Sequence, residues 1–392
     1  MSTAFTKSLQ NGAMLAVLLS STAPASAALI TQTNLVSNIP GLAVITDPDL
    51  LNPWGFSHSG TSPFWISNQG TGTSTLYNVT GPNGTTVTKN NINPPSNHVL
   101  IPTTAAGPQG PTGQVFNPNA AGFQVNNGGN GAKANFIFAN LNGTISAWNG
   151  GTTSFIQTTV PGAVYTGLTI NGASTQLYAA NAASGGIDVF NSSFGQVSVA
   201  PGAFATPPAI AALGLVPFNV QDIGGKVYVT YALPGRAAEI AAVGGQGGVA
   251  IFDEAGLLQN TIVNGELASP WGVTIAPAGF GDFGNALLVG NFSFLESEIN
   301  AFDSVTGSFL GSIPINTAGF EPGGLWQIGF GTGGNNGSPN TLYFTDGING
   351  ERGGLFGAIT AIPEPLTISL YCAGLMGLMG LTVLSRRKLK TA

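Results

Sequence analysis

The stretch Ser269-Pro-Trp-Gly-Val-Thr-Ile-Ala-Pro277 is the first part of a three-part unit that recurs along most of the chain. The second part is Asn285-Ala-Leu-Leu-Val-Gly-Asn291, and the third is Glu298-Ile-Asn-Ala-Phe-Asp303. Each part is a short run with apolar or β-branched residues, bounded by Gly, Pro, Asn or Asp. Such runs are typical of strands rather than helices. We therefore interpret the unit as three short strands joined by loops.

Five further units keep the same order of parts. The six units lie near residues 51–81, 109–150, 161–195, 215–256, 267–307 and 322–361. Units of about 40 to 50 residues that contain several strands are typical of propeller blades, and a closed ring of blades leaves only short exposed edges. Residues 28–361 are therefore predicted to form an all-β, six-bladed β-propeller.

The sixth unit has no downstream partner, so the strand near residues 32–37 is predicted to complete the last blade. The outer strand of each blade is poorly marked in the sequence. A pair of β-sandwiches, or a seven-bladed ring with one degenerate unit, is left open as an alternative.

The composition favours a folded chain with many turns. Of 392 residues, 58 are glycine, while 43% are hydrophobic and only 7% are charged, which differs from the apolar-poor, charge-rich composition of disordered chains. Residues 28–361 carry five basic and fifteen acidic side chains. This acidic balance argues against nucleic-acid binding, which needs basic patches. The single cysteine, Cys372, excludes an intrachain disulfide framework and a multi-cysteine metal site.

The N-terminus has the pattern of a secretory signal. Lys7 precedes the apolar run Ala13–Leu19, and Ala25-Ser-Ala27 follows as a small-residue cleavage site. Residues 1–27 are therefore predicted to be a signal peptide, and the protein is predicted to be exported.

The C-terminus carries three elements in order. Pro363-Glu-Pro365 is followed by the uncharged run Leu366–Leu384, which is long enough for a transmembrane helix, and then by a basic cluster that is expected to stay cytoplasmic. Residues 362–392 resemble the PEP-CTERM sorting signal of Gram-negative bacteria, and the matching residues are Pro363, Glu364, Pro365, Arg386 and Arg387. The resemblance implies sorting by an exosortase, with membrane attachment before delivery to the cell surface or to an extracellular polysaccharide matrix. A plain C-terminal membrane anchor is the alternative.

The ends of the second strands carry a repeated polar residue. In the fourth unit this residue is Tyr231, and in the others it is Asn68, Asn140, Asn181, Asn291 and Asp346. In a propeller these residues would lie on one rim, where amide and carboxylate oxygens could bind Ca²⁺ or hydrogen-bond a sugar. The alternative is that Asn ends strands because it suits tight turns.

Aromatic residues recur near the first strands, namely Trp54, Phe218, Trp271 and Trp326. We predict that they pack between blades, since large aromatics usually belong to the core. A carbohydrate-stacking platform is the alternative.

Motifs for catalysis are few. The chain has only two histidines, His58 and His98, and no Gly-x-Ser-x-Gly. Acidic residues such as Asp222 and Glu351 are scattered, and could act as acids or bases only if the fold gathers them.

Several motifs resemble those of a family of uncharacterised secreted bacterial proteins, many with PEP-CTERM tails. They include Asp47-Pro-Asp-Leu-Leu-Asn-Pro-Trp-Gly55, Ser269-Pro-Trp-Gly272 and Ile299-Asn-Ala-Phe-Asp303. In outline the family is similar to NHL-type six-bladed propellers, and it implies no established activity. Some propellers of that outline are metal-dependent lactonases with a Glu, Asn and Asp set. In this chain Asp346 is the only acidic residue of the rim, and no Glu corresponds to the Glu of the lactonase set. This difference disfavours an enzymatic function.

The predicted function is a non-enzymatic, surface-displayed module that binds glycans or protein partners in an extracellular matrix. A Ca²⁺-type lactonase-like hydrolase that uses the Asn/Asp rim is the alternative, and a purely structural matrix component is a third hypothesis.

Overall fold

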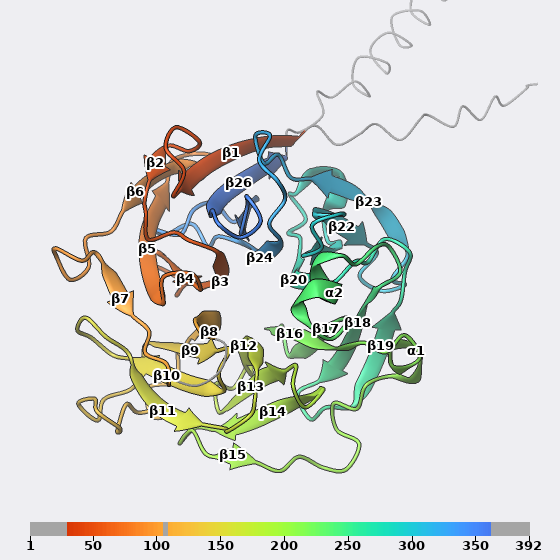
Figure 1. The fold of residues 1–392 in the computed structure, drawn as a ribbon, viewed down its shortest axis with the longest axis horizontal. Coiled ribbons are helices and arrows are strands. Elements are labelled where there is room, and N and C mark those ends of the chain that lie inside the picture. The colour runs from red at the N-terminus through yellow and green to blue at the C-terminus, as the bar shows by residue number, and fades with distance from the viewer. Residues whose placement is uncertain (1–29, 105–108, 362–392) are drawn as a thin grey trace, which may run out of the picture.

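The computed structural model describes residues 30–104 and 109–361, which form six β-sheets of four or five strands around a central axis (Figure 1). The prediction of an all-β, six-bladed β-propeller is confirmed. The predicted signal peptide, sorting motif and transmembrane helix lie outside the described residues. Within the described ranges, no helix is long and apolar enough to cross a membrane.

The strands nearest the axis begin blades 1 to 6 in chain order. They are β3 (Pro53–Ser57), β8 (Pro111–Phe116), β12 (Tyr165–Ile170), β16 (Val216–Ile223), β20 (Pro270–Ile275) and β24 (Leu325–Phe330). The second strands are β4 (Phe64–Asn68), β9 (Phe136–Asn140), β13 (Gln176–Asn181), β17 (Lys226–Ala232), β21 (Leu287–Asn291) and β25 (Thr341–Asp346). The third strands are β5 (Thr73–Thr80), β10 (Thr144–Trp148), β14 (Gly186–Asn191), β18 (Gly247–Asp253), β22 (Glu298–Phe302) and β26 (Leu355–Ala361).

The outer strands are the elements that the sequence marks least. They are β6 (Thr86–Lys89), β11 (Phe155–Thr159), β15 (Gln196–Val197), β19 (Leu258–Ile262), β23 (Phe309–Pro314) and, in blade 6, β1 (Ile30–Ser37). β1 pairs antiparallel with β26, with Ile30 opposite Ala361, so both ends of the described chain build the last blade (Figure 1). Two short strands, β2 (Ile45–Thr46) and β7 (His98–Leu100), add to blades 6 and 1.

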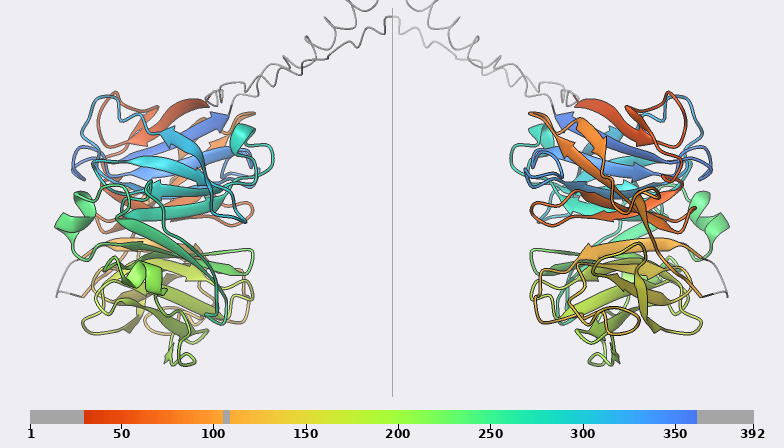
Figure 2. Two further views of the ribbon diagram at one scale, coloured as in Figure 1. Left: turned by 90° about the vertical axis from the view of Figure 1, so that its right-hand side faces the viewer. Right: turned by 90° about the vertical axis from the view of Figure 1, so that its left-hand side faces the viewer.

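All six innermost strands begin at one end of the channel, which we call the entry end, and finish at the other, the exit end. Second strands are antiparallel to them and finish at the entry end. The helix α2 (Arg236–Ile240) joins β17 to β18 and projects from this face (Figure 2). The other short helices are α1 (Pro208–Ala211) and the 3-10 turn η1 (Gly281–Phe283). Ile30 and Ala361 lie toward the exit end.

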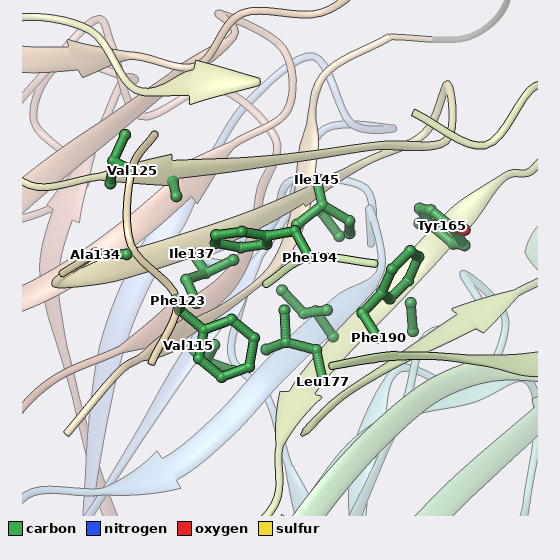
Figure 3. Close-up of a cluster of buried hydrophobic side chains, with 14 of the residues drawn as sticks. Val115, Phe123, Val125, Ala134, Ile137, Ile145, Tyr165, Leu177, Phe190 and Phe194 are labelled. Carbon is green, nitrogen blue, oxygen red and sulfur yellow. The ribbon is translucent and has the colours of Figure 1, made fainter. Parts of the chain in front are cut away.

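Apolar side chains fill the space between neighbouring blades. Between blades 2 and 3, for example, Ile137 and Ile145 pack with Tyr165, Leu177 and Phe190 (Figure 3). The alternation of side chains along a strand presents one set to each neighbouring blade. The core is therefore a ring of six interfaces rather than one central mass.

Near the axis the innermost strands approach too closely for side chains. A Cβ at Gly113 would overlap the backbone of Leu168 in the next blade, and a Cβ at Gly272 would overlap the carbonyl oxygen of Trp326. These contacts explain the glycine of the repeated Pro-Trp-Gly: it lets one innermost strand touch the next and keeps the channel narrow.

Candidate functional site

The five residues predicted to form a rim all lie at the entry end, each as the last residue of a second strand. They are Asn68, Asn140, Asn181, Asn291 and Asp346. Each is at most 4% exposed, and none lines the pocket at the exit end of the channel. The rim residues therefore share one end of the propeller but are packed within and between blades.

Two of the rim amides hold the loop that leads into the innermost strand of their own blade. The Oδ1 of Asn181 accepts the N–H of Val164 at 3.2 Å, and that of Asn291 accepts the N–H of Ala268 at 3.1 Å. Asn68 donates from Nδ2 to Thr75 Oγ1 at 3.0 Å. A Ca²⁺ ion shared by the rim would need the oxygens of Asn181 and Asn291, so these residues fit such an ion poorly. Their role as ligands stays a prediction.

Asn140 and Asp346 differ from the other three. The amide of Asn140 and both carboxylate oxygens of Asp346 are buried and have no hydrogen-bond partner in the structure. Burial raises the pKa of Asp346 to about 7, and the negative charge of Glu351 adds to the rise. Among the residues that the structure describes, no three His, Cys, Asp or Glu side chains are placed to hold a metal ion.

The aromatic residues of the first strands meet at the entry end, on the axis. Trp54 stacks on Trp326 with ring centroids 3.5 Å apart, and Trp271 meets both rings edge-on. Trp271 also donates its indole N–H to the carbonyl oxygen of Thr166 in blade 3 at 3.0 Å. Phe218 and Phe292 complete this buried aromatic cluster. It joins the blades as predicted for core aromatics, and its burial leaves no exposed ring for a sugar to stack on.

The helix α2 covers part of the aromatic cluster. The guanidinium of Arg236 lies 4.1 Å from the centre of the Phe292 ring, a cation–π geometry. Arg236 also pairs with Glu239 in the same helix and with Glu351 in blade 6. The entry end of the channel is therefore closed by aromatic rings and by the helix above them.

A pocket of about 470 Å³ opens at the exit end of the channel, and we call it the central funnel. All six blades contribute to its wall through the ends of their innermost strands and the loops that follow. The polar lining residues are Ser57, His58, Gln114, Thr169, Asn171, Ser174, Gln221, Asp222, Thr274 and Gln327. Apolar side chains, including Val115, Phe116 and Phe330, lie between them.

Three polar atoms of the funnel wall are buried and have no hydrogen-bond partner in the structure. They are Ser57 Oγ, Gln114 Oε1 and Asp222 Oδ2. Gln114 is only 5% exposed, and its Nε2 already donates to the carbonyl oxygens of Gly55 and Trp65 at 2.9 Å. The fixed amide thus presents a free acceptor. Because buried polar atoms in native proteins nearly always have partners, these three point to water or a ligand in the funnel.

The two titratable groups of the funnel are shifted toward their neutral forms. Burial raises the pKa of Asp222 to about 6, and the neighbouring carboxylate of Glu254 adds to the rise. Burial lowers the pKa of His58, whose ring nitrogens lie 3.1 Å and 3.2 Å from the carbonyl oxygens of Ser59 and Phe330. Among the residues that the structure describes, no lysine or arginine lines the funnel, so the described wall is close to neutral.

The repeated Asn and Asp residues in the sequence predicted a site at the entry end, whereas the funnel lies at the exit end. Asp222 and His58 were visible as scattered titratable residues, whereas Gln114, Gln221 and Thr274 belong to no catalytic or ligand-binding motif. The signal that could have found them is positional: they occupy the second half of each first strand, after the repeated Pro-Trp-Gly-like start.

Comparison with known proteins gives distant similarities. No family model matches the chain. Two proteins of Acanthamoeba polyphaga mimivirus, uncharacterized protein R648 and uncharacterized protein L690, are each 28% identical to it, over 341 and 289 residues. The alignments cover 83% and 71% of this chain, and 78% and 72% of the viral proteins.

Two solved structures are similar at low identity. Kuenenia stuttgartiensis hydrazine synthase has a TM-score of 0.47 and 15% identity, over 78% of this chain and 76% of the other. Virginiamycin B lyase from Staphylococcus aureus has a TM-score of 0.46 and 14% identity, over 85% of this chain and 99% of the other. None of these similarities carries an activity to this chain.

Proposed function

We propose that this protein is a non-enzymatic binding module of the cell surface or extracellular matrix, and that its central funnel takes a neutral, hydroxyl-rich ligand such as a segment of a polysaccharide. The observation that carries the proposal is a pair of buried, unpartnered polar atoms in the funnel wall, Ser57 Oγ and Gln114 Oε1. The amide oxygen of Gln114 can only accept hydrogen bonds, and the hydroxyl group of Ser57 can accept them as well as donate. A ligand rich in hydroxyl groups supplies the matching donors.

The rest of the wall favours the same chemistry. Amide and hydroxyl side chains such as Gln221 and Thr274 can both donate and accept, and Phe116 and Phe330 offer apolar surface beside them. Pockets that combine apolar walls with a few placed polar groups are typical ligand sites. An anionic ligand would meet the carboxylate of Asp222 and no basic side chain, so it is disfavoured.

The extracellular setting rests on the signals at both ends of the sequence, which predict export, sorting by an exosortase and membrane attachment before processing. Ile30 pairs with Ala361 toward the exit end, which is also the end where the funnel opens.

Calorimetric titration of the purified protein with neutral oligosaccharides, such as cello- and manno-oligosaccharides, tests the proposal. We expect saturable binding, no binding of an anionic polygalacturonate fragment, and at least tenfold weaker binding after Gln221→Ala. Gln259→Ala, an exposed position in the outer strand of the same blade, is the matched control and should bind normally. Absence of binding to every neutral sugar would contradict the proposal. Saturable binding of Ca²⁺ that Asp346→Asn removes would favour the hydrolase alternative instead.

A further inference from the structure

Blade 3 has the least complete outer strand of the propeller. Its outer strand β15 pairs with β14 at only two positions, Val189 with Val197 and Phe190 with Gln196. The corresponding third and outer strands are paired at four positions in blades 1, 2 and 4, at five in blade 5 and at seven in blade 6. The first half of β14 is therefore left as a sheet edge at the periphery (Figure 1).

The backbone groups of Ile187 face this open edge. The N–H of Asn191 donates to the carbonyl oxygen of Gly195 at 2.9 Å, on the β15 side. Both polar groups of a residue in an antiparallel strand point to the same side, and the side alternates from one residue to the next. The N–H and C=O of Ile187, four residues earlier, thus point outward as well. A continued register would place Val199 opposite Ile187, but the pairing ends at Val197.

A pocket of about 450 Å³ lies where the missing part of the strand would run. It is lined by residues 187–189 of β14 and residues 196–199 of the departing chain. Val199 is 41% exposed there. The carboxylate of Asp188 is turned away from the edge, since its Oδ2 accepts from Tyr165 Oη at 2.8 Å and from Asn181 Nδ2 at 2.9 Å.

The edge carries little of the usual protection against strand pairing. Natural edge strands are commonly blocked by lysine, by proline or by an inward-pointing charge. The segment Gln196-Val-Ser-Val-Ala200 contains none of these. Asp188 is the charged residue in the open part of β14, and its carboxylate is held within the blade by Tyr165 and Asn181. The edge offers an outward backbone donor and acceptor beside the pocket of about 450 Å³.

We propose that the outer edge of blade 3 is a strand-addition site that takes an extended peptide segment of a partner protein. The segment would pair antiparallel with residues 186–188 and complete the fourth strand of the blade. Backbone hydrogen bonds give such complexes their affinity, and alternate side chains give them their specificity. The partner is expected to carry β-branched or apolar residues at alternate positions, because Ile187 and Val197 pack toward blade 4.

The probe is a capped synthetic peptide, Leu-Gln-Asn-Thr-Ile-Val, which copies residues 258–263 and so is the natural outer strand of blade 4 with the residue after it. Added to the full-length protein, it should bind saturably and slow hydrogen exchange at the Ile187 amide at least tenfold. Val199→Lys should weaken binding at least tenfold. The matched control is Val305→Lys in the hairpin of blade 5, where the side chain is 80% exposed, and it should leave binding unchanged.

A second peptide, N-methylated at alternate residues so that its pairing edge is blocked, separates strand addition from simple apolar adsorption. It should not bind. Equal binding of both peptides would overturn the proposal, and so would unchanged exchange at Ile187 with millimolar peptide. A concentration-dependent dimer that Val199→Lys dissolves would also overturn it, because the edge would then belong to a second copy of the chain.

Discussion

The carboxyl group of Asp346 couples the stability of the fold to pH. Its pKa is about 7 in the folded protein because it is buried, against about 3.9 in an unfolded chain. A group whose folded pKa is raised contributes stability that is fully present below the unfolded pKa and is lost as the pH rises through the folded pKa. Asp346→Asn should remove this loss, so that the variant gains roughly 2–4 kcal/mol relative to the wild type between pH 4 and pH 8.

Urea unfolding at five pH values between 4 and 8 measures the effect. Asp282→Asn, in an exposed turn, is the control and should keep the wild-type pH dependence. Parallel stability curves for Asp346→Asn and the wild type would show that the buried carboxyl group does not titrate in this range.

Two tryptophans of the aromatic cluster separate packing from hydrogen bonding. Trp271 donates its indole N–H to Thr166, whereas the indole nitrogen of Trp54 has no partner in the structure. Both side chains are buried, at 0% and 3% exposure. Trp271→Phe should therefore destabilise the protein by about 1–3 kcal/mol more than Trp54→Phe, because it leaves a buried carbonyl oxygen unpaired. Denaturant unfolding of the two variants side by side gives the difference, and equal losses would contradict the role of the hydrogen bond.

At the scale of the strand, the glycines of the innermost strands decide how closely the blades approach the axis. Gly272→Ala should destabilise the fold by several kcal/mol or prevent folding, because the new methyl group would overlap the backbone of blade 6. Gly60→Ala is the matched control: it lies in a loop with nothing within 4 Å of the added carbon, and should change the melting temperature little. Thermal unfolding of both variants measures the difference in melting temperature between them. This difference would disappear if the innermost strands could move apart to make room for the methyl group.

The strands of each blade show which parts of the fold could be predicted from the sequence. Short runs bounded by turn residues predicted three strands in each blade, because that pattern is local. It could not show which end of the channel is open. Trp54 and Trp271 close the entry end only because four blades bring their aromatic residues to one axis, which no single blade encodes.

The rim prediction has a related origin. Asn181 and Asn291 recur at the ends of second strands, where their side chains accept backbone N–H groups of the loops before the first strands. Such a recurrence is visible in the sequence because both blades hold the preceding loop with the same side chain. The funnel residues Gln114 and Gln221 stand at different positions of their strands, the fourth of β8 and the sixth of β16, so no periodic pattern marks them. A periodic sequence pattern therefore predicts the strands and turns of the fold more readily than the residues of the binding site.

At the scale of the whole molecule, the ring is closed by backbone pairing between segments that are far apart in the sequence. β1 pairs with β26 at seven positions, and Gln32 Nε2 also donates to the carbonyl oxygen of Asn316, in the loop between blades 5 and 6, at 2.8 Å. Without β1, the edge of β26 would be exposed along its whole length, which favours association with other chains. The cost of closing so long a loop rises only slowly with its length, so this pairing can hold the two ends together.

Deletion of residues 30–37 tests the closure directly. We expect the shortened protein to unfold at a temperature several degrees lower and to form soluble aggregates, because blade 6 loses its outer strand while the other five blades keep theirs. A synthetic peptide of residues 30–37 added in trans should restore both the melting temperature and the monomer, whereas a scrambled peptide of the same composition should not. Size-exclusion chromatography and thermal unfolding measure the two effects. A deletion variant that stays monomeric with an unchanged melting temperature would mean that contacts between the innermost strands close the ring without β1.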